Sequence, residues 1–250
     1  MIEVRQGAKP RELEQDSARW LDEFRDAQLT ASQFWAKVTG RKAMKNYVQQ
    51  LHQACHHKCA FCESKPKATS SLQVEHYRPK GNPEFEALMF EWENWLSSCA
   101  SCNSKKWQHF PFCHGEPCLI NPSIENPTKH ISFQRETVLH KTCRGKKTIQ
   151  LIGLDRSSLE ADRAKWLLQI DTLLLLLLRD QATRTMAREL LIWAMQPYAP
   201  YSAMTYHYLS EKTPKLANPK KPHPHIKVDD PFKRIVELVE SNKESLMNLT

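Results

Sequence analysis

The spacing of apolar residues predicts helices along the first part of the chain. Residues 11–28 hold an apolar stripe at helical spacing. A short helix follows, which we expect Ser32 to cap and Gly40 to end in a left-handed conformation. A third apolar stripe covers residues 44–51. The pattern therefore predicts a helical N-terminal region, residues 1–55.

Helical spacing is lost in the middle of the chain. Residues 72–74 have the composition of a short strand. Further β-like pieces cover residues 130–133 and 148–152, with asparagine–proline turns nearby. We expect a compact module over residues 56–118 and a basic connector of strands and loops over 119–153.

Two long helices are predicted in the C-terminal part, over residues 155–178 and 181–195. They form a helical region that we assign to residues 154–210. The leucine run at residues 173–178 is apolar around its whole circumference, which predicts burial at a helix–helix interface.

Four prolines follow these helices. They predict a non-helical linker over residues 211–230, because proline lacks the N–H donor and clashes with the preceding turn. Residues 231–250 carry Phe232, Ile235 and Val236 on one face of a predicted amphipathic helix.

Composition favours a globular protein of the cytoplasm. The chain has 250 residues, 40% of them hydrophobic, which is enough for a core. The leucine run is far shorter than the roughly 20 residues of a membrane span. Glu3, Arg5 and Lys9 interrupt a secretory signal pattern. We therefore expect no membrane partner. In this compartment thiols stay reduced, so the eight cysteines indicate metal binding or core packing rather than disulfides.

Positive charge is concentrated in one stretch of the chain. The formal net charge is +8, and residues 129–150 contain six basic side chains and one acidic one. Phosphate backbones attract such a stretch by releasing counterions. A solvated charged loop has the same composition. Charge alone therefore does not decide between a nucleic-acid-binding surface and an ordinary solvated loop.

Two cysteine pairs have the spacing of zinc knuckles. Cys59 and Cys62 form the first C-x-x-C pair, and Cys99 and Cys102 form the second. Two intervening residues let both thiolates reach one ion, and two such knuckles give Zn²⁺ four sulfur ligands. We expect a structural zinc. A redox-active pair and buried free thiols are the alternatives.

The remaining cysteines lack this spacing. Cys113 and Cys118 lie near His109, but their separation is loose for a second metal site, and we expect ordinary packing. We expect Cys55 to flank the first knuckle and Cys143 to be a lone thiol.

Polar residues lie in a distinctive order between and after the knuckles. Glu75 and His76 are adjacent, Asn94 follows, and Asn103 adjoins the second knuckle. This order resembles the HNH (ββα-metal) nucleases. More narrowly, the motifs C-x-x-C-E, E-H-x-x-P-K, W-x-N-W and C-x-x-C-N-x-x-K resemble the PtuB-type HNH proteins. The resemblance covers about residues 45–165.

The resemblance implies a fold, cofactors and partners. The fold would be α+β and mainly helical, with a zinc-stabilised ββα-metal module between helical N- and C-terminal flanks. The cofactors would be a structural Zn²⁺ and a catalytic Mg²⁺ or Mn²⁺. The partners would be nucleic acid (DNA, or RNA such as tRNA) and the PtuA-like ATPase subunit of Septu and retron-linked anti-phage defence. A retron reverse transcriptase and its msDNA are further partners that it suggests.

The resemblance also implies roles for single residues. His76 would be the general base, since an imidazole titrates near neutrality. Glu75 and Asn103 would hold the catalytic metal through oxygen atoms. Asn94 would fix the loop or orient the His76 ring. The commonest motif ends in histidine where this chain has Asn103, a variant that we expect to weaken metal affinity.

Other side chains near these motifs are weaker candidates. Four basic residues are candidates for phosphate binding, with solvated surface as the alternative: Arg78, Lys80, Lys105 and Lys106. Three tryptophans could stack on bases, but we expect them to fill the small core: Trp92, Trp95 and Trp107.

Two other classes of function fit the same residues. A catalytically inactive, zinc-dependent nucleic-acid-binding adaptor would need the cysteines but not His76. A C-x-x-C thiol oxidoreductase would not hold zinc. The choice between DNA and RNA as substrate stays open, because phosphodiester hydrolysis is indifferent to the sugar.

Overall fold

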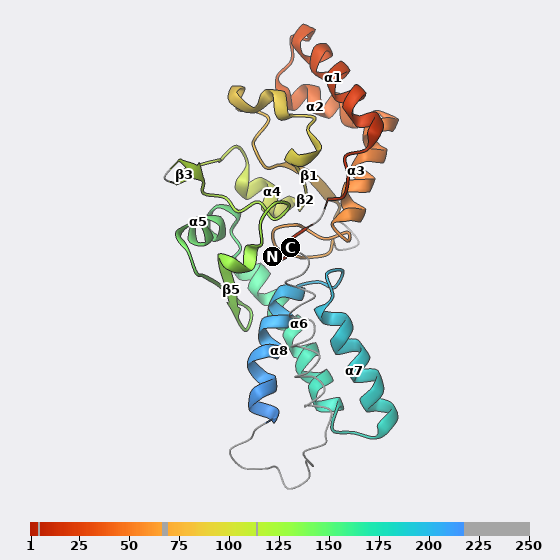
Figure 1. The fold of residues 1–250 in the computed structure, drawn as a ribbon, viewed down its shortest axis with the longest axis vertical. Helices are drawn as coiled ribbons and strands as arrows, with labels where there is room; N and C mark the ends of the chain where they lie inside the picture. The colour runs from red at the N-terminus through yellow and green to blue at the C-terminus, as the bar shows by residue number, and fades with distance from the viewer. Residues whose placement is uncertain (5, 67–69, 114, 218–250) are drawn as a thin grey trace.

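The computed structural model describes residues 1–250 with the exception of 5, 67–69, 114 and 218–250. The predicted amphipathic helix of residues 231–250 lies outside the described residues, as does most of the predicted linker. Figure 1 shows the N-terminal helices at one end, the C-terminal helices at the other, and small two-stranded sheets between them. The described part is mainly helical with small antiparallel sheets, which agrees with the expected mainly helical α+β character.

The three N-terminal helices are α1 (Arg11–Asp26), α2 (Ala31–Thr39) and α3 (Lys42–Ala54), as the apolar spacing predicts. Their buried faces do not form a core by themselves. They pack around residues from the middle of the chain, including Phe90 and Trp95. The helices of residues 1–55 therefore share a core with the predicted module of residues 56–118.

The ends of α2 differ from the prediction. Thr30, not Ser32, caps the helix, because its side chain accepts from the backbone N–H of Gln33, whose own side chain returns to Thr30. Gly40 has φ −71°, an ordinary right-handed conformation. The helix therefore begins two residues earlier than the expected cap at Ser32 would allow.

The centre of the molecule has the order strand, strand, helix. Strand β1 (Leu72–His76) pairs antiparallel with β2 (Trp95–Cys99), and α4 (Ala100–Lys106) follows directly. Successive side chains of β2 point to opposite faces of the strand. Trp95 packs into the core of the N-terminal helices and Leu96 into the other core. The hairpin thus separates two apolar cores.

Short elements fill the connections. Between the strands lie two 3₁₀ turns, η1 (Pro83–Leu88) and η2 (Trp92–Asn94). After α4 come β3 (Phe112–Cys113), β4 (Glu116–Pro117), η3 (Pro127–Lys129), β5 (Ile131–Gln134) and β6 (Thr137–His140). Strand β5 confirms the β-like piece expected at residues 130–133.

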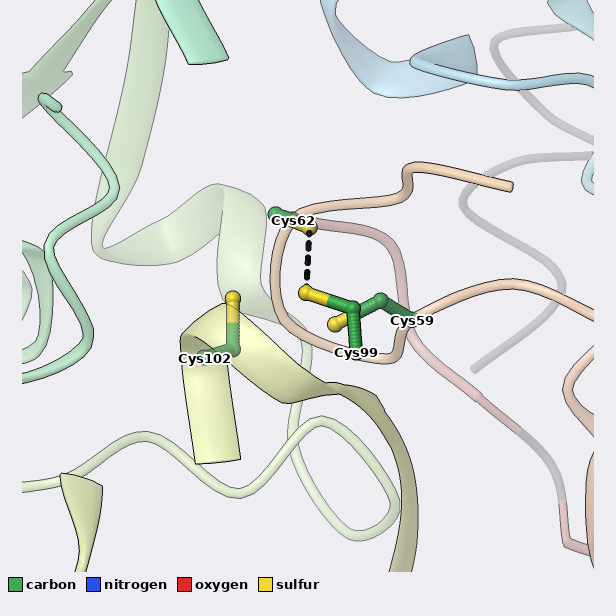
Figure 2. A group of neighbouring side chains, drawn as sticks. All are labelled: Cys59, Cys62, Cys99 and Cys102. Carbon is green, nitrogen blue, oxygen red and sulfur yellow. Dashed lines mark hydrogen bonds between the residues drawn. The ribbon is translucent and has the colours of Figure 1, made fainter. Parts of the chain in front are cut away.

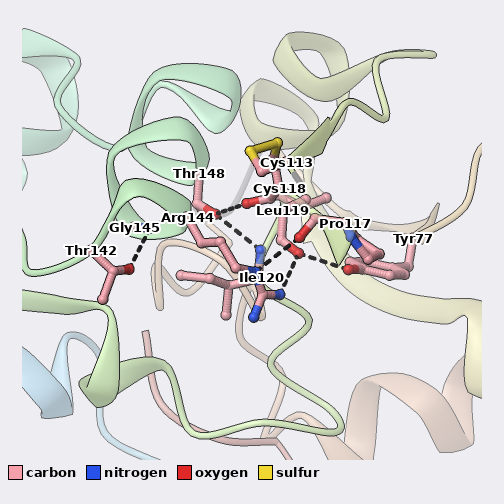
Figure 3. The surroundings of a disulfide bond; sticks show 10 residues. All are labelled: Tyr77, Cys113, Pro117, Cys118, Leu119, Ile120, Thr142, Arg144, Gly145 and Thr148. Carbon is pink, nitrogen blue, oxygen red and sulfur yellow. Dashed lines mark hydrogen bonds between the residues drawn. A yellow bond between two sulfur atoms is a disulfide. The ribbon is translucent and has the colours of Figure 1, made fainter. Parts of the chain in front are cut away.

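A disulfide joins Cys113 to Cys118, which corrects the expectation of ordinary packing and of reduced thiols throughout (Figure 3). The antiparallel pairing of β3 with β4 brings the two Cα atoms to 5.2 Å, within disulfide reach. The segment after it is held by hydrogen bonds: Arg144 Nε donates to Pro117 O (2.8 Å) and the Tyr77 hydroxyl donates to Leu119 O (2.7 Å).

The strand predicted at residues 148–152 is wrong, because these residues belong to helix α5 (Cys143–Ile152). The Thr142 hydroxyl accepts from the backbone N–H of Gly145 (3.1 Å) and caps the helix. Gly153 ends the helix in the left-handed conformation, with φ 63°. These end signals determine the helix although its last turn is rich in branched side chains.

The C-terminal helices α6 (Ser157–Leu176), α7 (Gln181–Met195) and α8 (Ser202–Ala217) pack together at one end of the molecule (Figure 1). Helix α8 continues beyond residue 210 and contains Pro214, so the linker predicted from residue 211 starts too early.

The leucine run is buried on one side, not around its circumference. Leu174 and Leu177 are buried, whereas Leu175 and Leu178 are 66% and 49% exposed. No helix of the described residues is long and apolar enough to cross a membrane.

Gly145 provides a test of the packing of α5. A Cβ atom at this position would lie 2.1 Å from the backbone oxygen of His130. We expect Gly145→Ala to lower the free energy of unfolding by about 1–3 kcal/mol, because backbone cannot move aside cheaply. Gly40→Ala is the control, since its Cβ would make one ordinary contact of 3.5 Å. Equal thermal midpoints for the two variants would contradict this packing.

Candidate metal centre and active-site cavity

The two predicted cysteine knuckles meet at one point. Cys59 and Cys62 lie in the turn that follows α3, Cys99 ends β2, and Cys102 lies in the first turns of α4. Their Sγ atoms all lie within 4.8 Å of one another, and those of Cys62 and Cys99 are 3.8 Å apart (Figure 2). The spacing is that of a four-sulfur site, and the group can hold a metal such as zinc.

The sulfur cluster is chemically suited to a cation. Hydrogen bonding from the Cys102 thiol holds the pKa of Cys62 well below its usual value and lowers the pKa of Cys99 to about 7, whereas burial raises the pKa of Cys59 and hydrogen bonding to the other sulfurs raises that of Cys102. Thiolates are the form of cysteine that binds metal. The half-buried Arg156 adds positive charge from outside, with Nη1 3.7 Å from Cys102 Sγ.

A cavity of about 520 Å³ collects residues from distant parts of the chain. Glu75 and His76 line it from the end of β1, and Asn103 lines it from α4. Three of the residues singled out in the sequence thus face one space. Cys102 and Asn103 are adjacent, so the cysteine cluster and the cavity share helix α4.

The His76 ring is held in one orientation. Its Nε2 lies 2.9 Å from the backbone oxygen of Met89, and its ring lies edge-on to Trp35 with centroids 4.4 Å apart. A carbonyl oxygen only accepts, so Nε2 carries the proton and Nδ1 is the basic nitrogen of the neutral ring. His76 is 3% exposed, and this burial holds its pKa well below the usual value. The imidazole is therefore neutral and free to accept a proton, but its lowered pKa makes it a weaker base than the imidazole titrating near neutrality that the sequence leads us to expect.

Glu75 and Lys106 form a buried ion pair, with Oε1 and Nζ 2.7 Å apart. Nζ also donates to the backbone oxygen of His76 (2.7 Å). Burial raises the pKa of Glu75 and lowers that of Lys106. Lys106 is 0% exposed, which corrects its assignment as a surface contact for phosphate. The sequence places a lysine four positions after Cys102. Only the structure of α4 shows that its side chain points inward, toward Glu75.

The second carboxylate oxygen of Glu75 has a different environment. Among the described residues, Oε2 is buried and has no hydrogen-bond partner. An unpaired carboxylate oxygen away from water is costly unless a cation or a donor reaches it.

Asn94 does not line the cavity but fixes the loop that follows β1. Its Oδ1 accepts from the backbone N–H of Arg78 (2.8 Å), and its Nδ2 donates to the backbone oxygens of Arg78 and Leu88 (both 3.0 Å). Two of these bonds hold residue 78, two positions beyond His76, to the segment that precedes β2, and the third ties that segment to Leu88. Asn103 is tied by one bond, from Nδ2 to Gln73 Oε1 (2.8 Å).

The other basic candidates lie in different surroundings. Lys80 lines the cavity, with Nζ 5.9 Å from the centroid of the Trp35 ring. Arg78 lies over the rings of Phe85 and Phe110 at 5.5 and 5.9 Å. The Lys105 residue is exposed to solvent. Of these three, Lys80 is the one that the structure brings to the cavity.

Sequence patterns missed part of the cavity wall. Trp35 of α2 and Lys45 of α3 line it, although both belong to the region set aside as a helical flank. Trp92 and Trp95 are buried, which confirms their place in the core. Trp107 lines the cavity and is 65% exposed, so its assignment to the core is wrong. No local pattern distinguishes these three tryptophans, because their exposure depends on tertiary packing.

Arg156 allows a test of the metal centre. Four thiolates around Zn²⁺ carry excess negative charge, which a neighbouring guanidinium offsets. We expect Arg156→Met to lower zinc affinity about 10–100-fold, measured by competition with a chromophoric chelator. Arg25→Met, at an exposed arginine of α1 paired with Asp22, is the matched control. Unchanged affinity in Arg156→Met would show that this cation does not support the site.

Comparison with known proteins identifies relatives of the chain. It is 29% identical over 157 residues to Septu protein PtuB of Bacillus thuringiensis, which covers 62% of this chain and 55% of that protein. It is 28% identical over 152 residues to Septu protein PtuB of Bacillus mycoides (strain KBAB4), covering 50% of each. Septu protein PtuA of the same strain is 24% identical over 181 residues, covering 62% of this chain and 24% of PtuA.

The extent of these matches limits what they show. No family model matches the chain. The chain spans about half the length of the PtuB proteins that it resembles. Within that span, the similarity supports a protein of the Septu PtuB type.

Proposed function

We propose that the chain is a metal-dependent HNH endonuclease that hydrolyses phosphodiester bonds of nucleic acid. The observation that carries the proposal is the convergence of Glu75, His76 and Asn103 on one cavity. The strand–strand–helix order of β1, β2 and α4, next to the four-cysteine cluster, supports an HNH module. The similarity of the chain to PtuB and PtuA supports a role as effector of an anti-phage system, in which it works with a PtuA-type ATPase.

The residues present fit a catalytic Mg²⁺ or Mn²⁺. Glu75 Oε2 is buried without a hydrogen-bond partner among the described residues, and the Asn103 amide lines the same cavity. Hard divalent cations prefer oxygen ligands of this kind. Glu75 and Asn103 would hold the ion, which when bound stabilises negative charge on the phosphate and the leaving oxygen. Lys106 keeps the carboxylate in place through its other oxygen.

His76 would accept the proton of the attacking water. As the water oxygen forms its bond to phosphorus, the bond from phosphorus to one ester oxygen breaks and the proton moves to Nδ1. The hydrogen bond from Nε2 to Met89 O fixes the ring and stabilises the protonated form. Because His76 is 3% exposed, a phosphate must enter the cavity to reach it.

Zinc at the cysteine cluster would act at a distance from the chemistry. It would tie the turn at residues 59–62 to the start of α4 and so keep Asn103 opposite β1. A four-sulfur site has no open position for substrate, which fits a structural role.

Replacing His76 tests the proposed reaction. We expect His76→Ala to remain folded with zinc bound, and to lose at least about 100-fold in cleavage rate. The assay incubates the full chain, its PtuA-like ATPase and Mg²⁺ with plasmid and with total cellular RNA in parallel. His52→Ala is the control, because this partly buried ring bonds to Ser97 Oγ (2.9 Å) outside the cavity.

The two substrates also identify the nucleic acid that is cut. Cleavage of either one by the wild type but not by His76→Ala supports the nuclease. Full retention of defence and of cleavage products in His76→Ala would instead favour a zinc-dependent binding adaptor.

A further inference from the structure

Trp107 is the most exposed tryptophan of the chain. It is 65% exposed, whereas Trp92 at the start of η2 and Trp95 at the start of β2 are 2% and 0% exposed. Its indole lines the cavity together with Asn103. Core packing therefore does not account for a large aromatic side chain at this position.

The backbone of Trp107 has an unusual conformation that places the indole there. Its φ is 44° and its ψ is −121°, a combination that is strained for a bulky residue. The strained residue ends α4, and its backbone N–H donates to the backbone oxygen of Asn103 (2.8 Å). Strain of this kind persists where surrounding structure imposes it, and it concentrates at functional sites.

The surroundings of the indole are basic. Lys45 and Lys80 line the same cavity, and Lys105 is exposed two positions earlier in the chain. Proteins that bind single-stranded nucleic acid combine positive charge along the backbone with aromatic rings on which bases stack. In a duplex, the faces of the bases are already covered by their neighbours, so such a ring finds a partner only where bases are unpaired.

We propose that Trp107 stacks on an unpaired base next to the phosphate in the cavity, and that the chain prefers single-stranded or looped nucleic acid. This inference rests on the proposed function, because it assumes that the phosphate enters beside His76 and Asn103. The indole would hold the base while Lys45 and Lys80 attract neighbouring phosphates. Trp107 is thus a residue that determines specificity rather than one that takes part in bond cleavage.

The test measures binding without cleavage. All variants are made in the full chain that carries His76→Ala, and dissociation constants are measured by fluorescence anisotropy at one fixed salt concentration. The probes are a labelled single-stranded oligonucleotide and its duplex, each as DNA and as RNA. Trp107→Ala is compared with Trp107→Phe, which keeps a ring, and with Trp193→Ala, which removes an exposed tryptophan of α7 outside the cavity.

We expect Trp107→Ala to weaken binding of the single strand about 5–100-fold and binding of the duplex much less. Trp107→Phe should retain most of the affinity, and Trp193→Ala all of it. The thermal midpoint of Trp107→Ala should not fall, because the side chain is exposed. Whichever single strand binds more tightly, DNA or RNA, shows which sugar the site prefers.

Equal losses on single strand and duplex, no loss on either, or no binding of single strands by the parent would each overturn the inference. The proposed nuclease reaction is tested separately from the stacking role. Loss of single-strand binding in Trp107→Ala, with no cleavage by the wild type, would leave the stacking role intact and contradict the proposed reaction.

Discussion

Four cysteine sulfur atoms meet at the start of one small helix, α4. Cys59 and Cys62 come from the turn after α3, and Cys99 and Cys102 bracket the start of α4. A metal shared by these sulfurs would fix the two segments against each other, for a module whose sheet has only two strands. Asn103 follows Cys102 directly, so the constraint on the sulfurs is also a constraint on the cavity.

The buried charges beside that cavity are better explained by function than by stability. Glu75 and Lys106 are 3% and 0% exposed, and a buried pair of this kind loses much of its attraction to the cost of desolvation. What the pair provides is a carboxylate fixed in orientation, with its second oxygen lacking a partner among the described residues. The neutral, oriented ring of His76 stands next to it in sequence and shares the cavity. Arrangements that perturb titratable groups in this way are typical of reactive sites.

The sequence predicts elements that local patterns determine, and it misses those that depend on tertiary contacts. The N-terminal helices, α6 and α7 follow from apolar spacing, β1 from its composition, and the cysteine pairs from their separation, whereas the third C-terminal helix, α8, is not predicted as a separate element. The last turn of α5 has the composition of a strand, so the sequence pattern predicts one. The caps at Thr142 and Gly153 instead make the segment helical. The Cys113–Cys118 bond depends on the register of a hairpin, and the inward direction of Lys106 depends on the turn of α4. Trp35 reaches the cavity from a helix about 40 residues before His76, a contact that no local pattern contains.

Anomalous X-ray diffraction from crystals that contain Zn²⁺ and are soaked in Mn²⁺ would locate both ions directly. We predict a zinc peak enclosed by the Sγ atoms of Cys59, Cys62, Cys99 and Cys102, and a manganese peak in contact with Glu75 and Asn103 beside the His76 ring. Zinc at the sulfurs with no manganese at those two side chains would contradict a metal-dependent nuclease in this cavity. It would leave a zinc-stabilised binding module.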